Sequence, residues 1–143
     1  MNDEVKEDSF SKQMEKEFPK MFSKKYGGFE VGPGWNLILK TLCFNIQHHI
    51  DWKQEQKEKY QRGEGCPQVV VDQIKEKFGG LRFYYQGGDE YIQGMVRIAE
   101  SWASSVCEEC GERGKLRPGG WMRTLCDKHE EERQQMYKER FEE

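Results

Sequence analysis

Four residues with the spacing of zinc ligands constrain this chain more than any other feature. Cys107 and Cys110 form a Cys-x2-Cys pair, and Cys126 and His129 form a Cys-x2-His pair after fifteen intervening residues. Two such pairs can surround one Zn²⁺ ion, and three cysteines with one histidine are a common structural donor set. Because four protein ligands leave no open coordination position, we expect this zinc to stabilise the fold and not to activate water.

The composition explains why the chain would need a metal. Hydrophobic residues make up 35% of the 143 residues and charged residues 34%, so the core must be small. A small core usually needs a metal, disulfides or a partner subunit. The first residues contain no secretory signal, and no apolar stretch is long enough to span a bilayer. We therefore predict a cytoplasmic protein without membrane contacts, whose cysteines bind metal and form no disulfides.

Hydrophobic periodicity predicts three helices before the zinc ligands and one after them. The first covers about 9–26, with a kink or a division into two shorter helices at its internal proline, and the second covers about 35–61. The third begins after an aspartate N-cap and covers about 90–106, where it forms the centre of the core. A charged helix follows from 130, and residues 1–8 are predicted to be disordered. The apolar stripes of these helices are Phe10, Met14, Phe18 and Phe22, then Trp35, Ile38, Leu42, Ile46 and Ile50, and then Ile92, Met95, Val96, Ala99, Trp102, Ala103 and Val106.

A β-hairpin is predicted between the second and third helices. Two β-rich runs flank Gly79-Gly80, a pair that is typical of a two-residue hairpin turn. With these glycines as the turn, Phe78 lies opposite Leu81, Glu76 opposite Phe83, and Ile74 opposite Tyr85. The other face of the hairpin then carries Lys75, Lys77, Arg82 and Tyr84.

The predicted fold is therefore α+β. Helices pack with the hairpin, which forms a small antiparallel sheet, and a zinc knuckle makes up the C-terminal region. We expect a single domain over residues 1–143, with a zinc-binding subregion over residues 107–129. A lone hairpin is marginally stable in water, so this one should pack on the third helix or pair with another chain.

Two basic surfaces are candidates for ligand binding. Lys75, Lys77 and Arg82 share a hairpin face with Tyr84, and positive charge beside a stacking ring suits a nucleotide, free or in a strand. The loop between the zinc ligand pairs contains further cations, which could contact phosphate. In both places the alternative is a solvated surface without a ligand. The loop cations are Arg113, Lys115, Arg117 and Arg123.

Two other groups of reactive residues are candidates for catalysis. His48-His49 with Asp51 resembles half of a metal or catalytic site, but nothing at useful spacing completes it. Asp72, Glu76 and Lys77 come near a nuclease pattern without its spacing, and the predicted register places Glu76 and Lys77 on opposite faces. Phosphate-binding loops, nucleophile elbows and dinucleotide fingerprints are absent from the sequence. We therefore predict a protein that is not an enzyme, with a metal-dependent nuclease or hydrolase as the weaker alternative.

The two remaining cysteines receive no functional role. Cys43 lies beside the apolar stripe of the second helix, which predicts a buried core residue. Cys66 lies in a glycine-rich loop and is interpreted as a loop thiol. The C-terminal anchors Met136 and Phe141, together with the polar end of the second helix, favour a homo-oligomer.

Several of these strings together resemble a group of small hypothetical proteins from phages and prophages. The resemblance covers about residues 18–130 and leaves the terminal helix outside. It rests on Lys75–Tyr84 (KEKFGGLRFY), Cys107–Gly111, Trp121, Thr124–Cys126 and Gly34-Trp35.

The resemblance implies a phage-encoded accessory protein in the cytoplasm of a bacterial host cell. In that setting we expect the chain to counteract bacterial defence by binding and sequestering a nucleotide immune signal. The basic face of the hairpin would hold the phosphate and the base without turnover. The alternative is a regulatory zinc protein that binds nucleic acid or a host protein through its basic zinc loop.

Overall fold

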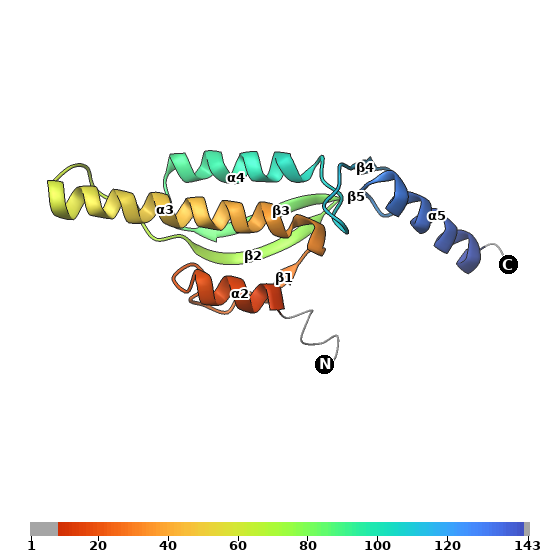
Figure 1. Ribbon diagram of the computed structural model, residues 1–143, viewed down its shortest axis with the longest axis horizontal. Coiled ribbons are helices and arrows are strands. Elements are labelled where there is room, and N and C mark those ends of the chain that lie inside the picture. Colours follow the sequence, from red (N-terminus) through yellow and green to blue (C-terminus); the bar gives the residue numbers. More distant parts are fainter. Residues whose placement is uncertain (1–8, 142–143) are drawn as a thin grey trace.

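The structure is a computed structural model that describes residues 9–141, so the predicted disorder of residues 1–8 lies outside the described residues. Its mixture of helices and two small sheets confirms the α+β prediction (Figure 1). In chain order the elements are α2 (Ser9–Glu17), β1 (Phe29–Glu30), the 3-10 turn η1 (Pro33–Trp35), α3 (Asn36–Tyr60), β2 (Val70–Lys77), β3 (Gly80–Gln86), α4 (Glu90–Ala103), β4 (Lys115–Arg117), β5 (Arg123–Leu125) and α5 (Asp127–Phe141).

The larger sheet has the order β1-β2-β3, with β1 parallel to β2 and β2 antiparallel to β3. Helices α3 and α4 lie together on one side of it, and α2 lies near β1 and β2 on the side away from α4 (Figure 1). The main core is formed between these layers, where Ile74, Leu81 and Phe83 of the sheet are buried. The hairpin therefore packs on the helices, as expected for a sheet too small to stand alone.

The turn of the hairpin differs from the prediction by one residue. Phe78 and Gly79 form it, with φ angles of 53° and 82°, and Lys77 pairs with Gly80. Glu76 consequently lies opposite Leu81 and Ile74 opposite Phe83, which corrects the predicted pairs. Positive φ at both central residues is typical of a type I′ turn, whose twist matches that of the flanking strands.

The helices follow the predicted hydrophobic stripes, with two differences. Helix α2 ends at Glu17, two residues before Pro19, because the residue before a proline is disfavoured in helical conformation. A short turn replaces the predicted continuation of this helix. In α4, Trp102 is 39% exposed although it was predicted to face the core. The Asp89 N-cap is confirmed, since its carboxylate accepts a hydrogen bond from the Ile92 N–H at 3.0 Å.

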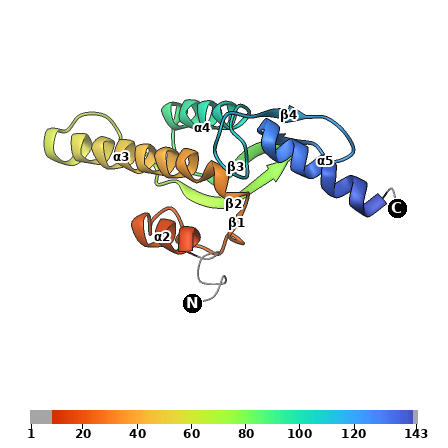
Figure 2. The same cartoon turned by 45° about the vertical axis from the view of Figure 1, so that its right-hand side comes forward.

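The C-terminal region extends beyond the end of the larger sheet. Strands β4 and β5 form a separate antiparallel pair there, and α5 leads away from α3 and α4 in both views (Figures 1 and 2). Across residues 9–141, no helix has the length and apolarity needed to cross a membrane.

Candidate metal centre

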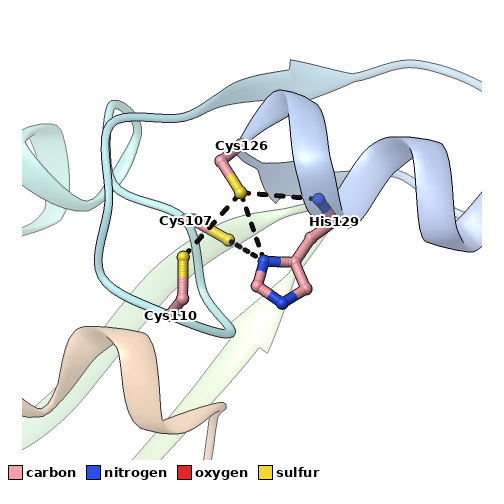
Figure 3. A group of neighbouring side chains, drawn as sticks. All are labelled: Cys107, Cys110, Cys126 and His129. Carbon is pink, nitrogen blue, oxygen red and sulfur yellow. Dashed lines mark hydrogen bonds between the residues drawn. The ribbon is translucent and has the colours of Figure 1, made fainter.

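The four predicted zinc ligands come together in the C-terminal region. The ligand atoms of Cys107, Cys110, Cys126 and His129 all lie within 4.8 Å of one another, so they are close enough to bind a metal ion. Three thiols and the imidazole ring point toward one common centre (Figure 3). Two ligands come from the loop after α4, one follows β5, and His129 belongs to the first turn of α5.

The distances between ligand atoms fit a tetrahedral site. The Cys110 and Cys126 sulfur atoms are 3.8 Å apart, and the His129 Nδ1 is 3.6 Å from the Cys107 sulfur and 3.2 Å from the Cys126 sulfur. Tetrahedral Zn²⁺ with Zn–S near 2.3 Å and Zn–N near 2.0 Å separates two sulfurs by about 3.8 Å and a sulfur from a nitrogen by about 3.6 Å. Two of the three distances match these values and the sulfur–nitrogen distance at Cys126 is shorter by about 0.4 Å, an arrangement consistent with a structural zinc.

The surroundings of the cluster support metal binding. His129 directs Nδ1 at the sulfurs, while its Nε2 lies 3.6 Å from a Glu109 carboxylate oxygen and 3.9 Å from one of Glu132. A carboxylate behind a ligating histidine orients the ring and raises its basicity. The backbone N–H of His129 points at the Cys126 sulfur and holds the pKa of this thiol at about 7, which favours the thiolate that a metal needs.

Backbone contacts fix the cluster to the rest of the fold through η1. The Gly34 N–H donates to the Glu108 carbonyl at 2.7 Å, and the Trp35 indole N–H donates to the Val106 carbonyl at 2.9 Å. A Cβ on Gly34 would lie 2.0 Å from the Cys107 carbonyl oxygen, so only glycine allows this approach. The resemblance included Gly34-Trp35, and contact with the first ligand pair is a structural reason for those residues.

The turn of the β2–β3 hairpin also contacts the metal-binding region, through β4 and β5. The Thr124 hydroxyl donates to the Gly79 carbonyl at 2.7 Å, and a Cβ on Gly79 would lie 2.5 Å from a Leu116 methyl group. This contact explains why the turn uses Gly79 at its second position. It also places β4 and β5 at the tip of the hairpin.

The basic loop between the ligand pairs is partly occupied by fold contacts. Arg117 pairs with Asp127 at 2.7 Å, and Arg123 contacts Glu108 and Glu109 at 3.4 and 3.0 Å. Arg113 is exposed and lines a shallow pocket of about 590 Å³ together with Arg117. This pocket contains no residue of the hairpin, so the two predicted basic surfaces do not form one site there.

The predicted hairpin face is present despite the shift in register. Lys75 lies directly opposite Arg82. Gln73 lies opposite Tyr84 in the next cross-strand pair on the same face of the sheet. Lys77 is exposed, and Tyr84 is 41% exposed. We call Lys75, Lys77, Arg82 and Tyr84 the hairpin face.

The carboxylates of the weaker nuclease hypothesis make fold contacts. Asp72 lies at a bulge in β2, where it pairs with Lys24 and accepts a hydrogen bond from Gln86 at 3.2 Å. Glu76 accepts a hydrogen bond from the Gly79 N–H at 2.6 Å and so stabilises the turn. Each carboxylate thus has a structural role of its own.

A second group of potential metal ligands was missed by the sequence analysis. The ligand atoms of His49, Cys66 and Asp89 lie within 4.8 Å of one another, with His49 Nε2 at 2.8 Å from an Asp89 oxygen. Asp51, which the sequence analysis considered together with His48-His49, accepts a hydrogen bond from Gln47 instead.

Cys66 lies in a loop, as predicted, and its thiol approaches side chains from two other parts of the chain. Cys66 is buried, as is Cys43, which confirms the core prediction for the latter. Burial, and then the neighbouring Asp89, raise the pKa of Cys66 to about 11 in the metal-free protein, because both disfavour the charged thiolate. The partners of His49 and Cys66 lie 40 and 23 residues away at Asp89, a spacing that matches no short motif.

Comparison with known proteins adds no family to this description. The chain matches no family model, no curated protein and no solved structure. The resemblance to phage proteins therefore remains a prediction.

Proposed function

We propose that this chain is a zinc-stabilised, non-enzymatic protein that binds a nucleotide on its hairpin face. The observation that carries the proposal is the cross-strand pair of Lys75 and Arg82 beside Tyr84. Two cations on adjacent strands suit phosphate oxygens, and an exposed tyrosine next to them suits a base. Among residues 9–141, the ion pairs involve neither of these cations, so their charges are available to a ligand.

The zinc would stabilise the hairpin face indirectly, through the β4–β5 pair. The Cys₃His cluster carries the β4–β5 pair, which contacts the hairpin turn through Thr124 and Leu116. A closed four-ligand zinc supplies rigidity and no reactive water. The proposed ligand is therefore bound and released unchanged.

The phage setting implied by the resemblance extends the proposal. There the ligand would be a nucleotide immune signal of the bacterial host, and the protein would counteract defence by sequestering it. A homo-oligomer, predicted from the exposed Met136 and Phe141, would multiply the binding sites. Nucleic acid or a host protein at the basic zinc loop is the alternative partner, with Arg113 and Lys115 as exposed cations.

The test is native mass spectrometry of the protein purified from defence-active cells, with Arg82→Ala and Lys75→Ala as variants. We expect the Cys₃His cluster to contribute one zinc per chain. We also expect a co-purified nucleotide that is recovered intact after denaturation. Both variants should lose the nucleotide, whereas Lys40→Ala, which removes an exposed cation from α3, should retain it.

Three outcomes would count against the proposal. Retention of the nucleotide by both hairpin variants would exclude the hairpin face. Recovery of a chemically altered nucleotide would exclude the non-enzymatic assignment. A steep fall in affinity with salt, together with binding of an oligonucleotide, would favour a nucleic-acid partner, because phosphate contacts along a strand release counterions.

A further inference from the structure

The cluster of His49, Cys66 and Asp89 brings together three different parts of the chain. His49 lies in the middle of α3, Cys66 in the loop before β2, and Asp89 at the N-cap of α4. The three residues offer a nitrogen, a sulfur and an oxygen donor within 4.8 Å of one another. This is a mixed donor set that transition metals such as Zn²⁺ accept.

Backbone contacts hold the two loops of the cluster against each other. The Gly88 N–H, next to Asp89 in the chain, donates to the carbonyl of Pro67, next to Cys66, at 2.9 Å. A Cβ on Gly87 would lie 2.1 Å from the Gln68 carbonyl oxygen, so the loops approach as closely as glycine allows. Gln68 also exchanges side-chain hydrogen bonds with Gln47 of α3 at 2.8 and 3.0 Å. The donor atoms are therefore positioned by a rigid frame.

The side chains themselves are oriented by further contacts. One Asp89 oxygen is engaged by the Ile92 N–H, which directs the other oxygen at His49. The His49 ring stacks on Tyr91, with ring centroids 4.4 Å apart and planes 12° from parallel. Ligands whose orientation is set before the metal arrives are typical of built metal sites.

One side of the cluster is open to a pocket of about 540 Å³. His49 and Asp89 line it together with Lys53 and His48. Trp52 and Tyr91 add aromatic surface to the same pocket. A metal held from the protein side would thus be reached from this pocket by an anionic ligand.

We propose that His49 Nε2, Cys66 Sγ and the Asp89 oxygen that contacts His49 bind a second Zn²⁺, which replaces the hydrogen bond between His49 and Asp89, with the fourth coordination position open toward the pocket. Three protein ligands and one exchangeable position distinguish this site from the closed Cys₃His cluster. The position takes a water molecule or an oxyanion such as phosphate, with Lys53 beside it. Tetrahedral coordination separates a nitrogen from an oxygen ligand by about 3.3 Å, so His49 and Asp89 move apart by about 0.5 Å on binding.

Zinc stoichiometry of the full chain tests the proposal. After reconstitution with Zn²⁺ and dialysis, native mass spectrometry should find two zinc ions per wild-type chain. Cys66→Ala and His49→Gln should each retain one, because the Cys₃His cluster is unaffected. Cys43→Ala, which removes a buried cysteine outside both clusters, should retain two. Circular dichroism shows whether each variant is folded.

Cobalt spectroscopy gives a second readout that does not depend on dialysis. Co²⁺ replaces Zn²⁺ at both sites, and the difference between the wild type and His49→Gln should contain a thiolate charge-transfer band from Cys66. Inorganic phosphate should change the visible spectrum of the wild type and leave that of His49→Gln unchanged. A spectral response in both proteins would exclude an open position at this cluster.

One result would overturn the second site altogether. If the wild type holds a single zinc and its cobalt spectrum equals that of His49→Gln, the cluster is a hydrogen-bonded network that joins α3 to the start of α4. The hairpin variants Lys75→Ala and Arg82→Ala should leave the stoichiometry at two, so this test is independent of the nucleotide proposal.

Discussion

Replacement of Gly34 by alanine should separate η1 from the first zinc ligand pair. The added Cβ would lie 2.0 Å from the Cys107 carbonyl oxygen and 2.6 Å from the Glu108 carbonyl carbon, and real Cβ atoms stay beyond 3.0 Å. Relief needs a backbone shift of about 1 Å, since the contacting atoms belong to the main chain and cannot rotate away.

Such a shift breaks three hydrogen bonds that hold η1 on the knuckle. These are Gly34 N–H to the Glu108 carbonyl (2.7 Å), Gly32 N–H to the Glu108 carboxylate (2.8 Å) and the Trp35 indole to the Val106 carbonyl (2.9 Å). At about 1 kcal/mol each, their loss lowers the free energy of unfolding by about 3 kcal/mol. The zinc affinity should fall as well, because Cys107 moves with its neighbours.

The assay is urea unfolding followed by circular dichroism, combined with zinc competition against a chelator. Gly94→Ala is the matched control, because Gly94 lies inside α4 with open space around it. Alanine is the better helix former there and should stabilise the fold by about 0.5–1 kcal/mol. A Gly34→Ala protein within about 1 kcal/mol of wild type, with unchanged zinc affinity, would refute the close-approach argument.

Three further variants test other parts of the structure. Cys126→Ser should lose the metal of the Cys₃His cluster, and hydrogen exchange should then show unprotected amides after residue 107 while α3 and α4 stay protected. Leu81→Ala should cost about 2–5 kcal/mol in thermal or urea unfolding, whereas Ile98→Ala, at 73% exposure, should stay within about 0.5 kcal/mol. Trp35→Phe removes the donor to the Val106 carbonyl and should cost about 1–3 kcal/mol in the same assay; no loss would mean that solvent replaces this bond.

Local patterns predicted the helices, the β2–β3 hairpin and the first metal cluster, but neither β1 nor the β4–β5 pair. The stripe from Trp35 to Ile50 lies on one face of α3 because burial of a helix follows its 3.6-residue period. The spacing of the Cys-x2-Cys and Cys-x2-His pairs predicted that the four ligands come together, since each pair is short enough to bind one ion with both of its residues. In these cases the information lies within a few residues of the feature.

Long-range contacts account for what the sequence analysis missed. Gly79 of the hairpin turn packs on Leu116, a contact across 37 residues that no turn rule contains. His49 was paired with the nearby Asp51, although the chain brings it to Asp89 and Cys66 only once α3, the loop before β2 and α4 are packed. Donors spread over three segments carry no spacing signal.

The contrast between the two clusters of ligands follows from the cores around them. The Cys₃His cluster belongs to a small buried group in which Leu125 is accompanied by two of the ligands themselves, Cys107 and Cys126. Burial of one leucine stabilises by about 1.5–3 kcal/mol, which does not offset the entropy of ordering even a few residues. Metal binding must therefore supply order to the β4–β5 pair, and through His129 to α5. His49 and Asp89 instead lie in elements of the main core, whose apolar side chains pack together without help from a metal. A metal ion bound by these residues is therefore not needed for folding and can coordinate an external ligand.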